Sequence, residues 1–336
     1  MKQGVLEKKA LSDVIESLLK DFTVYGPVKG DLISLQELSS GGDIALDFSN
    51  FKVSLKNLLT PRSEIVCTYE DGVANEVWLS EGKALVFGTR PCDARSLLVL
   101  DKVFTQDSED PSYVTRRNDT TIVSLACNAP AGTCFCASIG GSPFGREGSD
   151  ILACELNRVF LLEAVTEDGE RLMQNHAKLF HPATEAHLKE KDAMATKAES
   201  MLSTVDLENI GKSLEGLFDS TFWDEFHQRC LGCGAWTYLC PTCHCFGFYD
   251  ERSDPKGERI RYWDSCQYAA FTLEASGHNP RVSSRERMRQ RIMHKFSYFM
   301  KIFDEPACVG CGRCVDNCPV NLDLREIVTE VREASS

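Results

Sequence analysis

The stretch Cys308-Val-Gly-Cys311-Gly-Arg-Cys314-Val-Asp-Asn-Cys318-Pro319 decides the fold of the C-terminal part of the chain. Its spacing is C-x2-C-x2-C-x3-C-P, in which three thiolates ligate one [4Fe–4S] cluster and the fourth ligates another cluster. The glycines between the cysteines let the backbone wrap a cubane. Structural zinc sites favour two separated C-x2-C pairs, so residues 308–319, the Cys308 run, predict iron–sulfur chemistry.

The crossed ligation of such runs demands a second run, and residues 230–241, the Cys230 run, provide it. They read CLGCGAWTYLCP, with Trp236 in the place of the third cysteine. If the fourth cysteine of each run ligates the cluster of the other run, the first cluster is complete, with the ligands Cys240, Cys308, Cys311 and Cys314. This exchange leaves a second cluster with the three thiolates Cys230, Cys233 and Cys318.

Trp236 cannot ligate iron, so the second cluster is incomplete by sequence. It is then a [3Fe–4S] cluster, a cluster with an open iron, or a cluster that takes a ligand from elsewhere. The replacements nearest in sequence are Cys243 and Cys245, and Cys266 is a third candidate. We favour Cys243.

A third group of cysteines lies in the N-terminal half. Residues 84–88 and 120–126 read as strands, and cysteines follow both of them. If the strands are parallel neighbours, these cysteines reach the same sheet edge, where ligands collect in open α/β sheets. They are Cys92, Cys127, Cys134 and Cys136. We expect them to hold a third [4Fe–4S] cluster; buried free thiols and a zinc site are the alternatives.

The alternation of strands and helices predicts an α+β protein with an N-terminal α/β domain over residues 1–170. A helical connector is expected over 171–229 and an α-helical ferredoxin-like dicluster domain over 230–336. Within these, residues 6–21 and 94–104 read as helices, and so does 284–303, with Met288 and Ile292 on its apolar stripe.

Composition and charge argue against a nucleic-acid-binding, membrane-inserted or secreted protein. The chain has 336 residues and a net charge of −13, which argues against nucleic acid as a partner. No apolar stretch is long enough for membrane insertion, and the N-terminus lacks the apolar core of a signal peptide. We therefore expect a cytoplasmic protein, in which sixteen clustered cysteines indicate metal binding rather than disulfides.

Three segments closely resemble the four-iron dicluster subunits, a family found in anaerobic sulfite reductases and, as the β subunits, in cytoplasmic sulfhydrogenases. They are CLGCGAWTYLCPTCHCF, RYWDSCQYAAFTLEASGHNPR and CVGCGRCVDNCPVNLD. FGTRPCDARSLLVLDKVF and CNAPAGTCFCASIGGSPFG are similar to the family's N-terminal domain. The resemblance implies an electron-transfer subunit that works beside two others, one that binds flavin and NAD(P) and a further redox subunit. Trp236 departs from the family, which usually has cysteine there.

Two functions compete. The chain lacks a G-x-G-x-x-G or P-loop pattern, which favours single-electron relay to a reductase, hydrogenase or heterodisulfide-reductase-type partner. The alternative is a catalytic reductase subunit that binds a small sulfur substrate at the incomplete cluster. A basic run, residues 281–295, is either a solvated helix face, a docking face for an acidic partner, or a stabiliser of reduced clusters.

Overall fold

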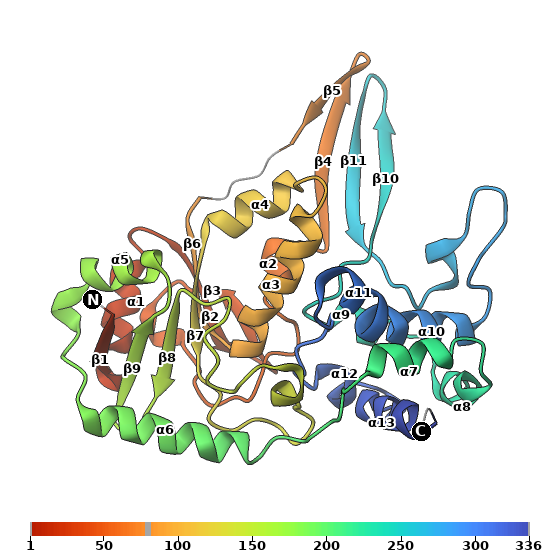
Figure 1. The fold of residues 1–336 in the computed structure, drawn as a ribbon. Helices are drawn as coiled ribbons and strands as arrows, with labels where there is room; N and C mark the ends of the chain where they lie inside the picture. The colour runs from red at the N-terminus through yellow and green to blue at the C-terminus, as the bar shows by residue number, and fades with distance from the viewer. Residues whose placement is uncertain (1, 78–81, 335–336) are drawn as a thin grey trace.

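The computed structural model describes residues 2–77 and 82–334. Its N-terminal part is built on a seven-stranded sheet of order β1-β9-β8-β7-β6-β2-β3 (Figure 1). The central strands β2, β6, β7 and β8 run parallel, and the remaining pairings are antiparallel. The strands are β1 (Gln3–Glu7), β2 (Thr23–Lys29), β3 (Ile33–Glu37), β6 (Ala84–Thr89), β7 (Thr120–Leu125), β8 (Ile151–Glu155) and β9 (Val159–Ala164).

Helices cover both faces of this sheet because its strands alternate their apolar side chains between two cores. Leu85 and Phe87 of β6 pack with α1, and Val86 between them packs on the opposite face with α3. The helices of this part are α1 (Leu11–Leu18), α2 (Lys56–Leu59), α3 (Pro91–Thr105), α4 (Pro111–Asn118) and α5 (Glu167–Asn175). The expected helix over 6–21 is shorter, because residues 3–7 instead pair with β9 as an edge strand.

A second, antiparallel sheet of order β10-β11-β4-β5 projects from the body (Figure 1). Its strands are β4 (Ser63–Glu70), β5 (Val73–Glu76), β10 (Phe246–Ser253) and β11 (Lys256–Trp263). The sequence predicts an α-helical domain over 230–336, and the β10–β11 hairpin corrects that prediction for residues 246–263. Aromatic residues at Phe246 and Phe248, and the β-branched Ile260 on the paired strand, favour strand over helix.

An ion-pair network fixes the base of the projecting sheet. Glu64 of β4 pairs with Arg116 of α4 at 2.6 Å and accepts a 2.9 Å hydrogen bond from the Arg261 Nε of β11. All three side chains are buried, and Arg261 also pairs with Asp110. The sheet therefore joins segments from both halves of the chain.

The connector is helical, and so is the C-terminal part apart from the β10–β11 hairpin. The fold class expected from sequence is confirmed. Long helix α6 crosses beneath the sheet toward the C-terminal part (Figure 1). The remaining helices are α6 (Glu185–Glu199), α7 (Ile210–Gly216), α8 (Phe222–Arg229), α9 (Ala235–Tyr238), α10 (Ser284–Met293), α11 (Phe299–Phe303), α12 (Arg313–Asp316) and α13 (Leu324–Ala334). A π-helical turn, His294–Tyr298, joins α10 to α11, so the predicted helix over 284–303 is continuous. Among the described helices, none is long and apolar enough to cross a membrane.

Candidate iron–sulfur sites

The two cysteine runs fold into the same loop. In each run both glycines adopt positive φ: 64° and 76° at Gly232 and Gly234, and 63° and 73° at Gly310 and Gly312. The first glycine amide donates to the first thiol sulfur, at 3.4 Å in both runs. A four-residue helix, α9 or α12, follows each loop. The sequence similarity of the runs is therefore also a similarity of backbone conformation.

Cys240 lies beside the three cysteines of the Cys308 run, as the crossed exchange requires. The pKa of the Cys308 thiol is raised to about 11, mainly by burial, and the Cys240 and Cys311 sulfurs also raise it. Burial also raises the pKa of Cys314, and Cys311, Cys308 and Cys240 add to this effect. Four half-buried thiols lie together here, and as thiolates they would repel one another, so they fit a site whose cationic core a cluster's irons would supply.

Cys230 neighbours Cys233 and Cys318, which are the three thiols predicted for the incomplete cluster. Burial is the largest cause that raises the pKa of Cys230. The Leu322 amide donates to the Cys318 sulfur at 3.2 Å. Cys233 is exposed, so this group reaches the protein surface.

Trp236 points into the hydrophobic core of the C-terminal part, where its indole is 7% exposed. Cys230, Cys308, Cys314 and Cys318 pack against the same core. Its Nε1 is buried and has no hydrogen-bond partner among the described residues. An unpaired buried N–H costs free energy, and cluster sulfides are acceptors that such a donor could meet.

The four N-terminal cysteines line one cavity, because β6 and β7 are parallel neighbours, as predicted. Burial raises the pKa of Cys134 to about 12 and that of Cys136 to about 11. The cavity is also lined by Cys311 of the Cys308 run and by the buried Arg90. Arg90 donates to the carbonyl oxygens of Ser49 and Ala126 at 2.9 Å, and within the described residues it forms no ion pair with a carboxylate. Its charge therefore favours anionic ligands in the cavity.

The Cys308 run is docked on the N-terminal cavity by close backbone packing. The Phe135 amide donates to the Gly310 carbonyl at 2.8 Å, and a Cβ on Gly310 would lie 2.6 Å from the Cys136 nitrogen. Arg313, 2% exposed, makes two 2.6 Å hydrogen bonds to the carboxylate of the fully buried Asp93. Sequence reasoning missed this contact, although Asp93 and Arg313 directly follow a predicted ligand and a motif glycine.

Cys245 and Cys266 form a pair of thiols, and Cys243 lies near Cys245 and also contacts Cys240 of the Cys308 site. The Cys245 thiol hydrogen-bonds to Cys266, and Cys243 hydrogen-bonds to Cys240. The strongest thiol neighbours of Cys230 are instead Cys233 and Cys318. That Cys243 is a metal ligand stays a prediction.

Three buried cations surround these thiols: Lys56, Arg291 and Lys295, each 3% exposed. Lys295 Nζ lies 3.3 Å from the Cys240 sulfur, and an Arg291 terminal nitrogen lies 3.5 Å from the Cys243 sulfur. Lys56 Nζ donates to the Cys243 carbonyl at 3.0 Å. In the part of the chain that the structure describes, none of the three pairs with a carboxylate, and the Arg291 Nε has no partner. Buried charge without a counterion is costly, so these residues fit anionic iron–sulfur clusters.

The basic run divides into two sets. Arg285 pairs with Asp224 of α8 at 2.7 Å, and Arg289 lies over the Phe218 ring in the turn between α7 and α8. These two residues therefore bind neighbouring segments. Arg291 and Lys295 are instead buried, and their side chains contact the sulfurs of Cys243 and Cys240. The π-helical turn contains Lys295, and such turns frequently occur at functional sites.

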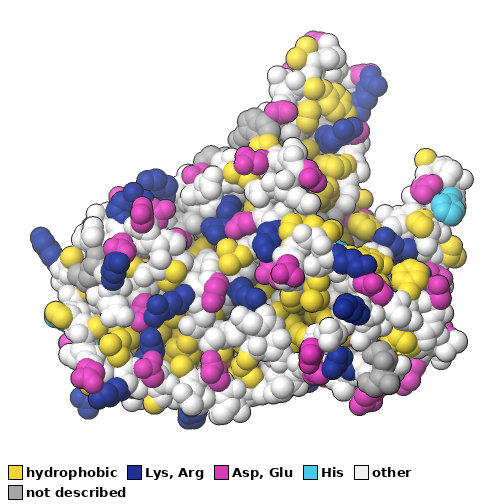
Figure 2. All heavy atoms as spheres, viewed as in Figure 1, with side chains coloured by type: hydrophobic (Ala, Val, Ile, Leu, Met, Phe, Trp, Pro, Cys, Tyr) yellow, Lys and Arg dark blue, Asp and Glu magenta, His cyan; other side chains and the backbone are white. Residues whose placement is uncertain are grey.

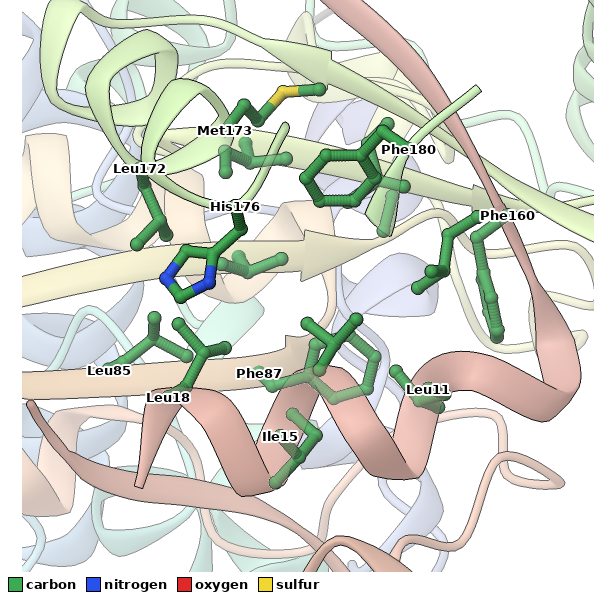
Figure 3. A pocket seen from close by; sticks show the side chains of 16 residues that line it. Leu11, Ile15, Leu18, Leu85, Phe87, Phe160, Leu172, Met173, His176 and Phe180 are labelled. Carbon is green, nitrogen blue, oxygen red and sulfur yellow. The ribbon is translucent and has the colours of Figure 1, made fainter. Parts of the chain in front are cut away.

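An apolar cavity in the N-terminal part lies between α1, α5 and the sheet (Figure 3). Hydrocarbon side chains such as Ile15, Phe87 and Phe160 line it, and among the described residues that line it only His176 is titratable. His176 Nδ1 lies 3.3 Å from the Ser17 hydroxyl. This lining suits packing of the helices on the sheet.

Comparison with known proteins points to one family. The 4Fe-4S dicluster domain family matches residues 229–322, which include both cysteine runs. The β subunit of sulfhydrogenase 2 from Pyrococcus furiosus is 31% identical in an alignment 316 residues long, which covers 92% of this chain and 92% of that protein. Among solved structures, Sphingomonas wittichii serine palmitoyltransferase aligns with 63% of this chain and 56% of its own, at 8% identity; the TM-score of 0.18 is too low to indicate a shared fold.

Proposed function

This chain belongs to the family of sulfhydrogenase β subunits, and we propose that it relays single electrons through three consecutive iron–sulfur sites to a partner subunit. It is an iron–sulfur electron-transfer subunit with [4Fe–4S] clusters. Each cluster supplies a one-electron couple whose potential depends on charge, hydrogen bonds and burial. The protein's part is to hold the clusters close together and exclude water between them.

The observation that carries the proposal is the position of Cys311. It neighbours Cys308 and Cys314 within its run, and it also lines the cavity of the four N-terminal cysteines. The Cys134 sulfur lies 3.7 Å from the Cys311 carbonyl oxygen. Cys311 therefore lies at both the N-terminal site and the Cys308 site. Two sites that share a residue are close together, which supports direct electron exchange between them.

Cys233 marks the surface end of the proposed relay. Beside it, Leu231 is 69% exposed, an apolar side chain that a partner subunit would cover. The relay we propose connects a partner that binds flavin and NAD(P) with a reductase, hydrogenase or heterodisulfide-reductase-type partner. A single flavin hydroquinone would supply two electrons in turn, and each site would accept one.

Catalysis at the incomplete cluster is less well supported. Trp236 fills the place of the missing ligand with a large apolar ring and is nearly inaccessible to solvent. A small sulfur substrate would have to displace this ring from the core. We therefore favour relay.

The test is metal analysis, EPR and turnover on anaerobically purified chain. The three sites of the relay should hold about eight to twelve irons per chain, with matching sulfide, and should be reduced by a flavin-containing partner. The isolated chain should not turn over sulfur substrates. Zinc without iron and sulfide, or catalysis by the isolated chain, would contradict the relay.

A further inference from the structure

The β10–β11 hairpin brings Cys245 and Cys266 together. Cys245 directly precedes β10 and Cys266 follows β11, and the two strands pair from Phe246 opposite Trp263. At the base of the hairpin the Asp264 amide donates to the Cys245 carbonyl at 2.9 Å. The hairpin base therefore places the two thiols within hydrogen-bonding reach of each other.

Cys243 lies near this pair, because it is two residues before Cys245 in the segment that leads into β10. Its sulfur accepts a hydrogen bond from Arg291 at 3.5 Å, and Arg291 also faces the Cys266 sulfur. Thr237 Oγ1 lies 4.0 Å from the Cys266 sulfur. Cys243 and Cys266 thus face a buried guanidinium whose Nε is unpartnered among the described residues, and Cys243 and Cys245 face the buried Lys56.

The charge around this group exceeds what the Cys308 site balances. A [4Fe–4S] core of charge +2 with four thiolates carries −2, whereas Lys56, Arg291 and Lys295 together carry +3. Lys295 is bound at Cys240, in the Cys308 site. Lys56 and Arg291 contact Cys243, through its carbonyl oxygen and its sulfur. Arg291 also neighbours the Cys230 site, whose cluster would compensate its charge, but Lys56 faces Cys243 and Cys245. Because buried cations persist where an anion compensates them, Lys56 favours further negative charge beside Cys243.

We propose that Cys243, Cys245 and Cys266 hold a further iron–sulfur cluster, separate from the Cys230 site; this rests on the proposed iron–sulfur function. Three thiolates complete a [3Fe–4S] cluster, or leave one iron of a [4Fe–4S] cluster to a non-thiolate ligand. Among the described residues no three His, Cys, Asp or Glu side chains converge as a single ion requires. A cluster gives each thiolate its own iron, so such convergence is not needed. The site lies at the base of the projecting sheet, beside a surface that a partner could contact.

That surface carries apolar side chains. Phe248, Tyr249 and Val73 of the projecting sheet are 53%, 43% and 61% exposed. Figure 2 shows hydrophobic side chains, in yellow, along this projection. A cluster at its base would be the second point at which electrons reach the surface.

The experiment compares Cys245→Ala and Cys266→Ala with the wild-type chain, all purified anaerobically and assayed for iron, sulfide and EPR signals. Each variant should lose the same signal and about three to four irons per chain, and the double variant should lose no more than either. Cys67→Ala, on β4 of the same sheet, is the matched control and should lose none. Circular dichroism checks that each variant is folded.

A combined Cys230→Ala and Cys245→Ala variant tests whether the two sites are separate. We expect its iron loss to equal the sum of the two single losses. Equal loss in the single and combined variants would assign Cys245 to the Cys230 cluster and overturn the proposal, as would unchanged iron content in Cys245→Ala or zinc in its place. A wild-type chain without iron would instead contradict the proposed function itself.

Discussion

The Cys230 run and the Cys308 run have the same backbone and opposite surroundings. Leu231 and Val309 occupy the same position, but Leu231 is 69% exposed and Val309 is 2% exposed. A Cβ on Gly310 would meet the backbone of Cys136, whereas the nearest atom to a Cβ on Gly232 is 3.8 Å away. The loop of the Cys308 run is therefore packed between the N-terminal and C-terminal parts of the molecule. The loop of the Cys230 run is partly exposed to solvent.

This difference separates the two roles that a cluster can have. A cluster held between two parts of a protein connects them, so its ligands contribute to the fold as well as to electron transfer. A cluster at the surface can meet a partner, and its loss leaves the rest of the fold in place. The position of each run, rather than its spacing, then predicts what a mutation does.

The largest expected difference is between Cys311→Ala and Cys233→Ala, the second cysteine of each run. Cys311→Ala should remove about four irons and also disturb the N-terminal site, whose cavity it lines. Cys233→Ala should remove one cluster and leave the unfolding temperature close to wild type. Iron analysis and anaerobic thermal unfolding measure both; equal destabilisation by the two variants would break the comparison.

Arg313→Ala should destabilise the protein by about 3–5 kcal/mol, because it leaves the carboxylate of Asp93 buried without its partner. The matched control is Arg229→Ala, which breaks the exposed pair with Glu326 beside the Cys230 run. Solvent screens that pair, so its loss should cost at most about 1 kcal/mol. Anaerobic thermal unfolding reads the difference. If Arg313→Ala also costs so little, the Cys308 run is not held by this contact.

Sequence alone predicted the elements on which the sites depend. The parallel pair β6 and β7 and the cysteines that follow them came from apolar runs and from the rule for sheet edges. The grouping of Cys92, Cys127, Cys134 and Cys136 in one cavity follows from that pair. Spacing likewise predicted that Cys240 lies with the Cys308 run.

Contacts between residues far apart in the chain could not be predicted from the sequence. The pairing of β4 with β11 joins residues almost two hundred positions apart, and no local pattern specifies such a register. The buried pair Arg313–Asp93 and the inward turn of Lys56 likewise depend on tertiary packing. The β10–β11 hairpin did carry a signal, since aromatic alternation from Phe246 indicates a strand.

Trp236→Cys tests the remaining difference between the runs, the missing third cysteine. The new thiol should complete the Cys230 cluster, change its EPR signal and add about one iron if the wild-type cluster is [3Fe–4S]. Trp236→Phe keeps an aromatic ring but removes the unpartnered Nε1 donor, and should alter the potential without changing the iron count. Identical spectra and iron content in wild type and Trp236→Cys would mean that Trp236 does not affect ligation.

Arg291→Gln should give the smallest effect, a shift of potential with the cluster inventory intact. Arg291 neighbours thiols of both sites, and its positive charge favours the more negative, reduced cluster. Removing one charge about 10 Å from a cluster should lower its reduction potential by about 70 mV, from Coulomb's law at an effective dielectric constant of about 20. Anaerobic redox titration followed by EPR measures this, with Arg291→Lys as the charge-preserving control. The reduction potential of the Cys308 cluster should shift more than that of the Cys230 cluster. Such a result would show that burial, which reduces screening by solvent, determines the effect of the Arg291 charge on each cluster. Equal shifts would mean that the two surroundings do not differ electrostatically.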